Sequence, residues 1–218
     1  MRQLETVQRG SRGETVRILQ ARLGVQQSSV FGPTTEQVVR EFQRQHGLTA
    51  DGVAGPVTWA ALLSVRHQAL RLARKEIGVR EEPPGSNRGP KIDAWNRLAG
   101  VPVGSFWCMS FVHAKVREAA DELDVRSPMP VTASCSALYA WAERHGKLVS
   151  TPQPGDIFLV RGGVGGRTHQ HTGFVAGPAS ANRFPTIEGN SNGGGSRNGI
   201  EVAARPSRSA IGCDFVRL

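Results

Sequence analysis

Apolar residues recur at helical spacing in three short segments within the first 65 residues. In residues 14–23, Val16, Leu19 and Leu23 share one face, and Gly24 follows as a stop signal. The next two segments form an internal repeat, because FGPTTEQVVREF and AGPVTWAALLSV both place Gly-Pro-x-Thr before an apolar-periodic run. Proline in the first turn of a helix costs no hydrogen bond, so both runs predict helices. A three-helix bundle is expected, with a core of Val39, Phe42, Leu48, Trp59 and Leu62.

A second set of helical patterns begins at about His67. Leu70, Ala73 and Ile77 fall on one face of a helix that is predicted to end at Gly78. The stretch REEPPGSNRGPKI holds too many prolines and glycines for regular structure and predicts a loop. Further helices are expected in DAWNRLAG, in the run after Cys108, and in ASCSALYAWAERHG.

Beyond Gly146 the pattern changes from helical to extended. GDIFLV, HTGFVAG, FPTIEGN, IEVAARP and CDFVRL are β-rich runs bounded by glycine and proline, and NSNGGGSRNG reads as a loop among them. Helices followed by strands predict an α+β domain with an antiparallel sheet. We therefore expect two domains, a small bundle over residues 1–65 and an α+β domain over residues 66–218.

The composition limits the classes of partner. The chain of 218 residues carries a net charge of +9, which suits polyanions in general, including the bacterial cell wall. It lacks a polybasic run or a basic patch interleaved with aromatic residues, so nucleic acid is not an expected partner. No stretch reaches the length of a membrane span, and MRQLETVQRG lacks the apolar core of a secretory signal. Synthesis in the cytoplasm is expected, followed by release through lysis or secretion.

Three cysteines are too few for a disulfide framework, so a reduced, reactive thiol is one use for them. Apolar positions from Phe111 to Ala119 recur at helical spacing, which puts Cys108 at or near a helix N-terminus. Backbone amides and the helix dipole favour a thiolate there. The alternative is that Cys108 is a buried packing residue. Cys135 and Cys213 are expected to be such core residues.

A cysteine nucleophile also requires a base and a group that orients the base. HTGFV begins with His171, and the next predicted strand ends in IEGN, where Glu188 and Asn190 share one face. Counting back from the turn GPASANR brings His171 close to Glu188 or Asn190. His169 has the same parity as His171 and is the alternative base, although it lies beyond this pairing. A one-residue slip would turn Glu188 away, so the assignment depends on register.

The first 65 residues resemble the peptidoglycan-binding domain of bacterial and phage cell-wall hydrolases. The stretches that carry the resemblance are RGSRGETVRILQARLGV, FGPTT, VVREFQRQHGL and DGVAGPVTWAAL, in the family's order. The family often has Asp-Gly before the first Phe-Gly, where this chain reads SSVFG, whereas the second copy keeps Asp51-Gly52. The resemblance implies a three-helix module that binds the wall.

Residues 69–218 resemble the cysteine, histidine-dependent amidohydrolase/peptidase family, known as CHAP, which has a papain-like fold. The matching stretches are GVREEPPGSNRGPKI, FWCMSFV, PGDIFLV, HTGFV and IEGN. The resemblance implies a triad of Cys108, His171 and Glu188, with Asn190 assisting nearby. The family more often has alanine where this chain has Met109. Some members carry an Asp-x-Asp calcium loop before the cysteine, which VPVGSFWC lacks, so no metal and no other cofactor is expected.

Together the two resemblances imply a peptidoglycan hydrolase that cleaves an amide bond in the peptide portion of the wall through a cysteine nucleophile. A phage endolysin that acts as a monomer is the expected setting, with peptidoglycan as its partner. The alternatives are a bacterial antagonistic effector or wall-remodelling enzyme with the same chemistry, or a non-catalytic wall-binding protein. The sequence leaves open whether the enzyme is an N-acetylmuramoyl-L-alanine amidase or an endopeptidase.

Overall fold

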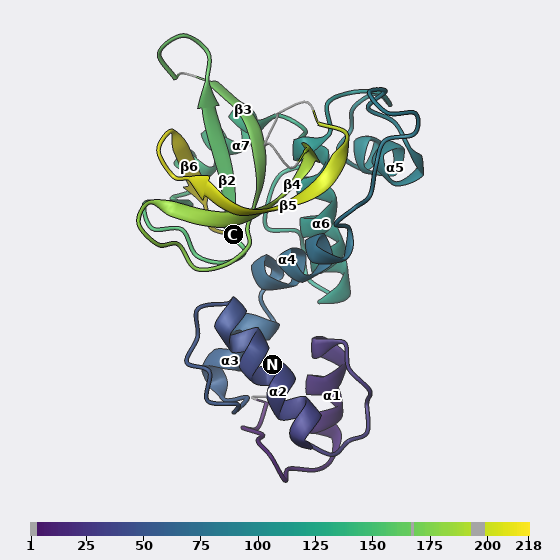
Figure 1. Cartoon of the computed structure of the whole chain (residues 1–218), viewed down its shortest axis with the longest axis vertical. Coiled ribbons are helices and arrows are strands. Elements are labelled where there is room, and N and C mark those ends of the chain that lie inside the picture. Colours follow the sequence, from purple (N-terminus) through teal and green to yellow (C-terminus); the bar gives the residue numbers. More distant parts are fainter. Residues whose placement is uncertain (1–3, 167, 193–198) are drawn as a thin grey trace.

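The computed structural model describes residues 4–166, 168–192 and 199–218, and Figure 1 shows two units that follow one another along the longest axis. The N-terminal unit contains α1 (Glu14–Leu23), α2 (Pro33–Gln45) and α3 (Pro56–Leu62). The three helices enclose a core of their own, whose buried members include Val16, Leu19, Val39, Trp59 and Leu62. Phe42 and Leu48, which were also expected in this core, are only partly buried.

Two buried glutamines explain the internal repeat. The side-chain amide of Gln20 in α1 donates to the Thr35 hydroxyl, fifteen residues on, at 3.1 Å. Gln43 in α2 donates at the same sequence distance to the Thr58 hydroxyl at 3.0 Å, and also to the Asp51 carboxylate at 2.8 Å. Each glutamine thus ties the turn that follows its helix to the first turn of the next helix, which satisfies polar groups that would otherwise be buried without partners.

The C-terminal unit combines helices with an antiparallel sheet, so the expected α+β class is confirmed. Its helices are α4 (Val65–Lys75), α5 (Pro90–Leu98), α6 (Cys108–Glu122) and α7 (Cys135–Arg144), with a short 3-10 turn, η1 (Val164–Gly166). Its strands are β1 (Leu148–Val149), β2 (Ile157–Gly162), β3 (Thr168–Val175), β4 (Arg183–Ser191), β5 (Glu201–Ser209) and β6 (Cys213–Val216), in the order β1-β6-β2-β3-β4-β5. None of the described helices is both long and apolar enough to span a membrane.

The central part of the sheet is buried on both faces, which explains the continuous apolar run IFLV in β2. Ile157, Leu159 and Phe174 pack in the main core with residues of α4 to α7. Phe158 and Phe184 belong to a smaller cluster of aromatic and aliphatic side chains. α6 packs against both β3 and β4, and its first residue, Cys108, interacts with His171 of β3.

The helix that was expected to begin at about His67 begins at Val65 and ends at Lys75, so the prediction that Ile77 shares its buried face is wrong. Ile77 is 47% exposed. The cause is a change of backbone partner, since the Gly78 amide donates to the carbonyl of Val202 at 2.9 Å. Pairing with the strand that carries Val202 draws the chain out of the helix before Ile77. Most of the predicted loop NSNGGGSRNG, residues 190–199, lies outside the described residues, since 193–198 are not described.

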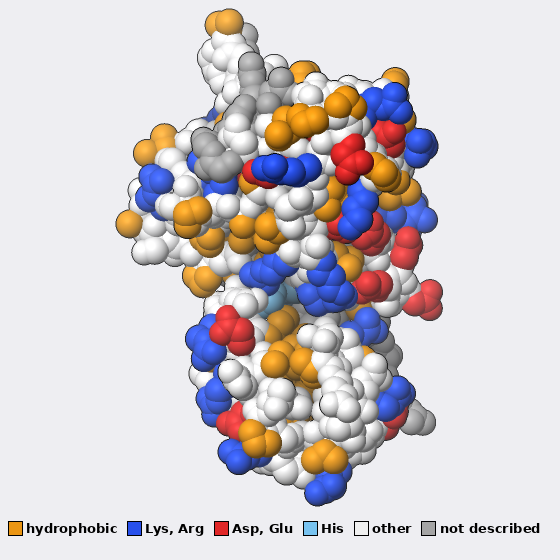
Figure 2. Space-filling view, turned by 45° about the vertical axis from the view of Figure 1, so that its right-hand side comes forward, with side chains coloured by type: hydrophobic (Ala, Val, Ile, Leu, Met, Phe, Trp, Pro, Cys, Tyr) orange, Lys and Arg blue, Asp and Glu red, His pale blue; other side chains and the backbone are white. Residues whose placement is uncertain are grey.

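The two units meet at a pair of buried histidines. His46 of α2 and His67 of α4 lie with ring centroids 4.7 Å apart in an edge-to-face arrangement. Burial lowers the pKa of His46 to about 4 and that of His67 to about 3, so both are neutral at neutral pH. Beside them is a hollow of about 300 Å³ lined by Arg71, Arg74 and Lys75 of α4 and by residues of α1 and α2. Figure 2 shows Lys and Arg side chains gathered where the units meet.

Candidate active site

Cys108 is the first residue of α6 and lies at the inner end of that helix, with 7% of its surface exposed. A hydrogen bond from the Cys135 thiol is the largest influence that holds the pKa of Cys108 well below its ordinary value. Burial opposes this effect, while the His171 imidazole and the Met109 amide at the helix start add to it. The surroundings therefore favour the thiolate, which is the nucleophilic form of cysteine.

His171, on β3, lies between Cys108 and Glu188. Its Nε2 donates to the Oε2 atom of Glu188 at 2.9 Å. Its Nδ1 is buried and makes no other hydrogen bond among the described residues, so it is the ring nitrogen available to Cys108, whose thiol interacts with His171. Burial lowers the pKa of His171, but hydrogen bonds to Cys108 and Glu188 outweigh burial and raise it to about 9. The cysteine and the histidine therefore favour a thiolate–imidazolium pair at neutral pH.

Glu188, on β4, is fully buried and accepts hydrogen bonds from four side chains. Besides His171, the Thr186 hydroxyl donates to its Oε1 at 2.5 Å and the Ser191 hydroxyl to its Oε2 at 3.1 Å. The guanidinium of Arg208 on β5 donates to both oxygens. Burial alone would raise the pKa of Glu188, yet the His171 and Arg208 hydrogen bonds lower it strongly. Glu188 is therefore a charged and fixed acceptor for His171.

The hydrogen bonds of the Asn190 side chain go to other residues than His171. Its side-chain amide donates to Glu81 at 3.3 Å and to Asn87 at 3.0 Å, from a backbone with a left-handed φ of 52°. The same Glu81 carboxylate oxygen accepts from the Trp107 indole at 2.9 Å. Asn190 is thus linked through Glu81 to the residue that precedes Cys108. Sequence reasoning missed Glu81, although it lies in the matched stretch GVREEPPGSNRGPKI.

His169 lies on the same strand as His171 but has different neighbours. A register irregularity between Val160 and Arg161 of β2 breaks the two-residue alternation, because these adjacent residues pair with His171 and His169 respectively. His169 Nε2 contacts the Asp214 carboxylate at 2.8 Å. The structure therefore brings His171, and not His169, to Glu188 and Cys108.

The two other cysteines occupy different surroundings. Cys135, the first residue of α7, was expected to be a core residue, and it is buried, but its thiol also bonds to Cys108. That bond and burial raise the pKa of Cys135 far above its ordinary value, so it remains a protonated donor. Cys213 is partly buried, and burial raises its pKa to about 11. The shared position of the two cysteines is the signal for the contact between Cys135 and Cys108. Each is the first residue of a helix, and both helices pack on β3.

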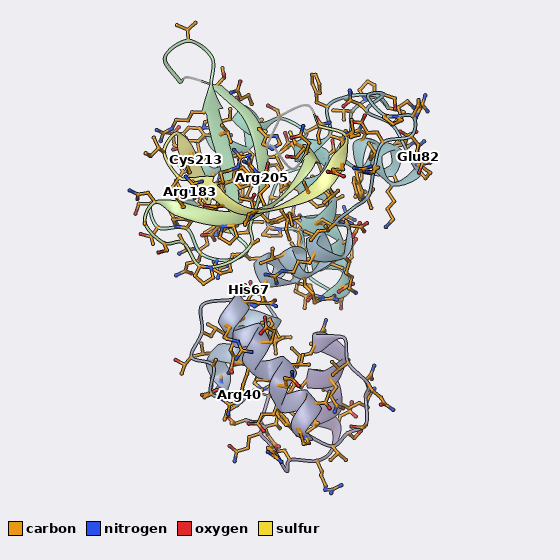
Figure 3. All side chains as sticks on the ribbon, in the orientation of Figure 1. Arg40, His67, Glu82, Arg183, Arg205 and Cys213 are labelled. Atoms are coloured by element: carbon orange, nitrogen blue, oxygen red, sulfur yellow. The ribbon has the colours of Figure 1, made fainter. Side chains whose placement is uncertain are left out.

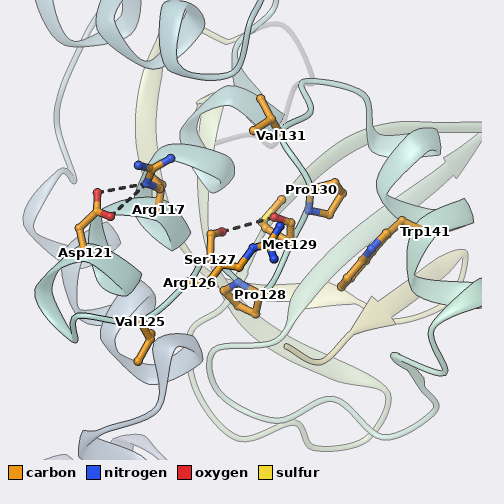
Figure 4. A pocket seen from close by; sticks show the side chains of 10 residues that line it. All are labelled: Arg117, Asp121, Val125, Arg126, Ser127, Pro128, Met129, Pro130, Val131 and Trp141. Atoms are coloured by element: carbon orange, nitrogen blue, oxygen red, sulfur yellow. Dashed lines mark hydrogen bonds and ion pairs between the residues drawn. The ribbon is translucent and has the colours of Figure 1, made fainter.

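A pocket larger than the hollow between the two units lies away from Cys108, His171 and Glu188. It has a volume of about 530 Å³, and its α6 residues Arg117 and Asp121 lie toward the opposite end of the helix from Cys108. Figure 4 shows Trp141 on one side of the pocket and the segment from Arg126 to Val131 across it. The pocket contains no member of the Cys108–His171–Glu188 cluster and forms a separate surface.

The arrangement of thiolate, imidazolium and carboxylate is suited to nucleophilic acyl transfer. The thiolate can form a bond to a carbonyl carbon, the imidazolium can protonate the leaving group, and the carboxylate holds the imidazole in one orientation. Each group comes from a different element, namely α6, β3 and β4. Packing of α6 on β3 and β4 is what brings the three together.

Comparisons with known proteins assign two regions of the chain. Residues 12–62 match the family model of a peptidoglycan binding domain, and residues 100–190 match that of the CHAP domain. The zinc D-Ala-D-Ala carboxypeptidase of Streptomyces albus G is 45% identical over 62 residues, which are 25% of this chain and 24% of that protein. An uncharacterized protein in the bpoA1 3' region of Kitasatospora aureofaciens is 40% identical over 57 residues, which are 23% of this chain and 48% of that protein.

The chain thus spans about a quarter and about half of the length of these two relatives. A solved structure of a Burkholderia AP3 phage endolysin is 23% identical, with 65% of this chain and 62% of that chain covered, at a TM-score of 0.28. The CHAP match includes Cys108, His171, Glu188 and Asn190. The chain therefore joins an N-terminal peptidoglycan-binding domain to a C-terminal CHAP domain, the domain composition of a modular peptidoglycan hydrolase.

Proposed function

We propose that this protein hydrolyses an amide bond in the peptide portion of bacterial peptidoglycan, with Cys108 as the nucleophile. The observation that carries the proposal is that His171 interacts with Cys108 while its Nε2 bonds to Glu188, inside the region that matches the CHAP domain. We propose the domain boundaries 1–65 for wall binding and 66–218 for catalysis. The separate cores of the two units support this division.

In the proposed reaction the Cys108 thiolate attacks the carbonyl carbon of the scissile amide and forms a tetrahedral intermediate. The intermediate collapses when the C–N bond breaks, and the leaving amine takes the proton from the His171 imidazolium. This leaves a thioester on Cys108 and a neutral imidazole. His171 then removes a proton from a water molecule that attacks the thioester, and the acid product leaves as the thiolate–imidazolium pair is restored.

Glu188 and Asn190 have different proposed roles in this reaction. Glu188 orients His171 through the bond to Nε2 and stabilises the imidazolium. Asn190 acts indirectly. It bonds to Glu81, which also accepts from the Trp107 indole and so helps to hold Trp107, the residue directly before Cys108. A neutral asparagine held by Glu81 is therefore proposed as a positioning residue, and not as a member of the acid–base pair.

Chemical analysis of digested wall tests this proposal. Purified peptidoglycan incubated with the protein is expected to gain free amino groups without gaining reducing sugar ends, because an amide bond is cut and glycosidic bonds are not. Mass spectrometry of the soluble fragments then identifies the bond, and separates an N-acetylmuramoyl-L-alanine amidase from an endopeptidase. New reducing ends without new amino groups would contradict the proposal.

A chain that begins at residue 66 is the matched control for the role of the N-terminal domain. It is expected to release the same fragments from soluble muropeptides at a similar rate, and to act more slowly on insoluble wall, because it lacks the wall-binding module. We further propose that the protein is a monomeric phage endolysin, made in the cytoplasm and released to the wall at lysis. A neighbouring holin gene would support that setting over a bacterial effector or remodelling enzyme.

A further inference from the structure

Arg208 makes the most extensive contact with the carboxylate that orients the histidine. Its Nε donates to Oε1 of Glu188 at 2.8 Å and its Nη2 to Oε2 at 2.7 Å, so the pair is bidentate. The Arg208 side chain is only 13% exposed, and that of Glu188 is fully buried. The guanidinium also lies 5.0 Å from the centroid of the Phe158 ring. Buried, planar and stacked contacts of this kind fix a carboxylate in both position and orientation.

The register of β5 explains how Arg208 reaches Glu188. Arg208 pairs with Phe184 on β4, whereas Glu188 pairs with Ala203. A register irregularity between Phe184 and Thr186 lies within this stretch of the ladder. Arg208 therefore lies opposite Phe184 in the ladder, but its long side chain extends to the Glu188 carboxylate. Its guanidinium lies over the Phe158 ring.

The charges around Glu188 come from several elements. His171 of β3 and Arg208 of β5 touch its carboxylate directly, and Arg205 of β5 lies farther away, with 3.8 Å between Nη1 and Oε1. Cys108 of α6 interacts with His171. The charges of Glu188 and Arg208 also act on the thiol of Cys213 in β6, with opposite effects on its pKa. Arg208 is thus the guanidinium nearest to Glu188.

A buried carboxylate with no cation beside it would act on its neighbours more strongly than Glu188 does. It would stabilise the imidazolium of His171 further and disfavour a second negative charge on Cys108. An arginine bound to both oxygens offsets most of that field, while His171 Nε2 still bonds to Oε2. The carboxylate can then orient the imidazole without holding its proton too tightly.

We propose that Arg208 is a positioning residue that sets the pH range in which the Cys108–His171 pair is reactive, by neutralising and fixing Glu188. This role rests on the proposed function only where hydrolysis is the readout, since the reactivity of the Cys108 thiol can be followed without any substrate.

The test compares three full-length variants with the wild-type protein. Arg208→Gln removes the charge, Arg208→Lys keeps it without the bidentate geometry, and Arg183→Gln removes an exposed charge from β4 whose side chain bonds to Ser207 and not to Glu188. Figure 3 labels Arg183 and Arg205 on the sheet. The rate at which iodoacetamide alkylates Cys108 is measured from pH 4 to 10 by peptide mass spectrometry, alongside the pH profile of wall hydrolysis.

Arg208→Gln is expected to raise the midpoint for Cys108 alkylation and the upper limb of hydrolysis by about one pH unit each, because the uncompensated Glu188 charge raises the pKa of both partners. Alkylation at the acid side of the midpoint then slows about tenfold. Arg208→Lys should keep the wild-type midpoint while it lowers the rate of hydrolysis, and Arg183→Gln should change neither quantity. A merely structural role for Arg208 would lower activity without moving either midpoint.

An unshifted midpoint in a folded Arg208→Gln protein, or an equal shift in Arg208→Lys, would overturn the proposal. Circular dichroism establishes folding. If Arg208→Gln does not fold, Arg205→Gln decides, since this more distant charge should shift the midpoint in the same direction by a smaller amount, and no shift would count against the proposal. Wild-type protein that shows a low alkylation midpoint but no wall hydrolysis would refute the proposed function alone, and the alkylation comparison would still decide the role of Arg208.

Discussion

Replacing Cys108 with alanine is expected to abolish wall hydrolysis, with a fall of at least about 10⁴-fold in rate, because the nucleophile of a catalytic triad has no substitute within the site. The change removes one sulfur atom from a small buried position. The protein should therefore remain folded and should still sediment with purified wall. Loss of turbidity of a wall suspension, followed with equal amounts of wild-type and variant protein, measures the effect.

Cys213→Ala is the matched control for this prediction. Cys213 is a partly buried cysteine whose sulfur contacts the Ser209 carbonyl at 3.5 Å. It lies on β6, whereas α6 packs on β3 and β4. Its removal should leave the rate of hydrolysis within about twofold of wild type, in keeping with substitutions away from a catalytic unit. Lysis at the wild-type rate by Cys108→Ala would show that Cys108 is not the nucleophile.

Substitution of the two neighbouring histidines is expected to give very different results. His171→Ala should lower the rate by several orders of magnitude, since the base and proton donor acts as a unit with the thiol. His169→Ala should lower it by about tenfold or less, because His169 contacts Asp214 and stacks on Tyr139 with ring centroids 4.5 Å apart. Initial rates of amine release from soluble muropeptides provide the comparison, with circular dichroism as the check on folding.

Comparable losses in the two histidine variants would contradict the assignment of the base, and so would the larger loss at His169. The two residues share one kind of contact, since both lie on β3 and each contacts a carboxylate, at 2.8 Å for His169 and 2.9 Å for His171. A loss that came only from breaking a histidine–carboxylate contact would therefore appear in both variants. The difference between them isolates the contact with Cys108.

Local sequence patterns predicted several helices and the pairing of β3 with β4, because each of these features depends on residues that are close together in the chain. The Gly-Pro-x-Thr repeat and the apolar spacing after Cys108 correspond to helices that begin at Pro33, Pro56 and Cys108. Counting residues back from the turn between the two strands predicted that His171 lies near Glu188. The count works because β3 and β4 pair directly, with Phe174 opposite Ile187. In each case the deciding information lies within a few residues of the element or of its nearest neighbour.

Other features depend on distant parts of the chain and could not be predicted in this way. The irregularity that separates His169 from His171 depends on how β2 pairs with β3, and no residue in THQHTGFV signals it. The end of α4 before Ile77 depends on a bond to Val202. The contact of Arg208 with Glu188 likewise depends on the register of β5, which no local pattern in IEVAARPSRS reveals.

Selective alkylation at pH 6 tests the central claim, that Cys108 is an activated thiolate on which hydrolysis depends. An ordinary thiol with a pKa of about 8.5 is almost fully protonated at that pH. Limited treatment with iodoacetamide, peptide mass spectrometry and a parallel assay of wall hydrolysis give the site of labelling and its effect. We expect Cys108 to be labelled ahead of Cys135 and Cys213, and hydrolysis to fall in proportion to the fraction of Cys108 labelled. Labelling of another cysteine first, or full activity in protein labelled at Cys108, would contradict the claim.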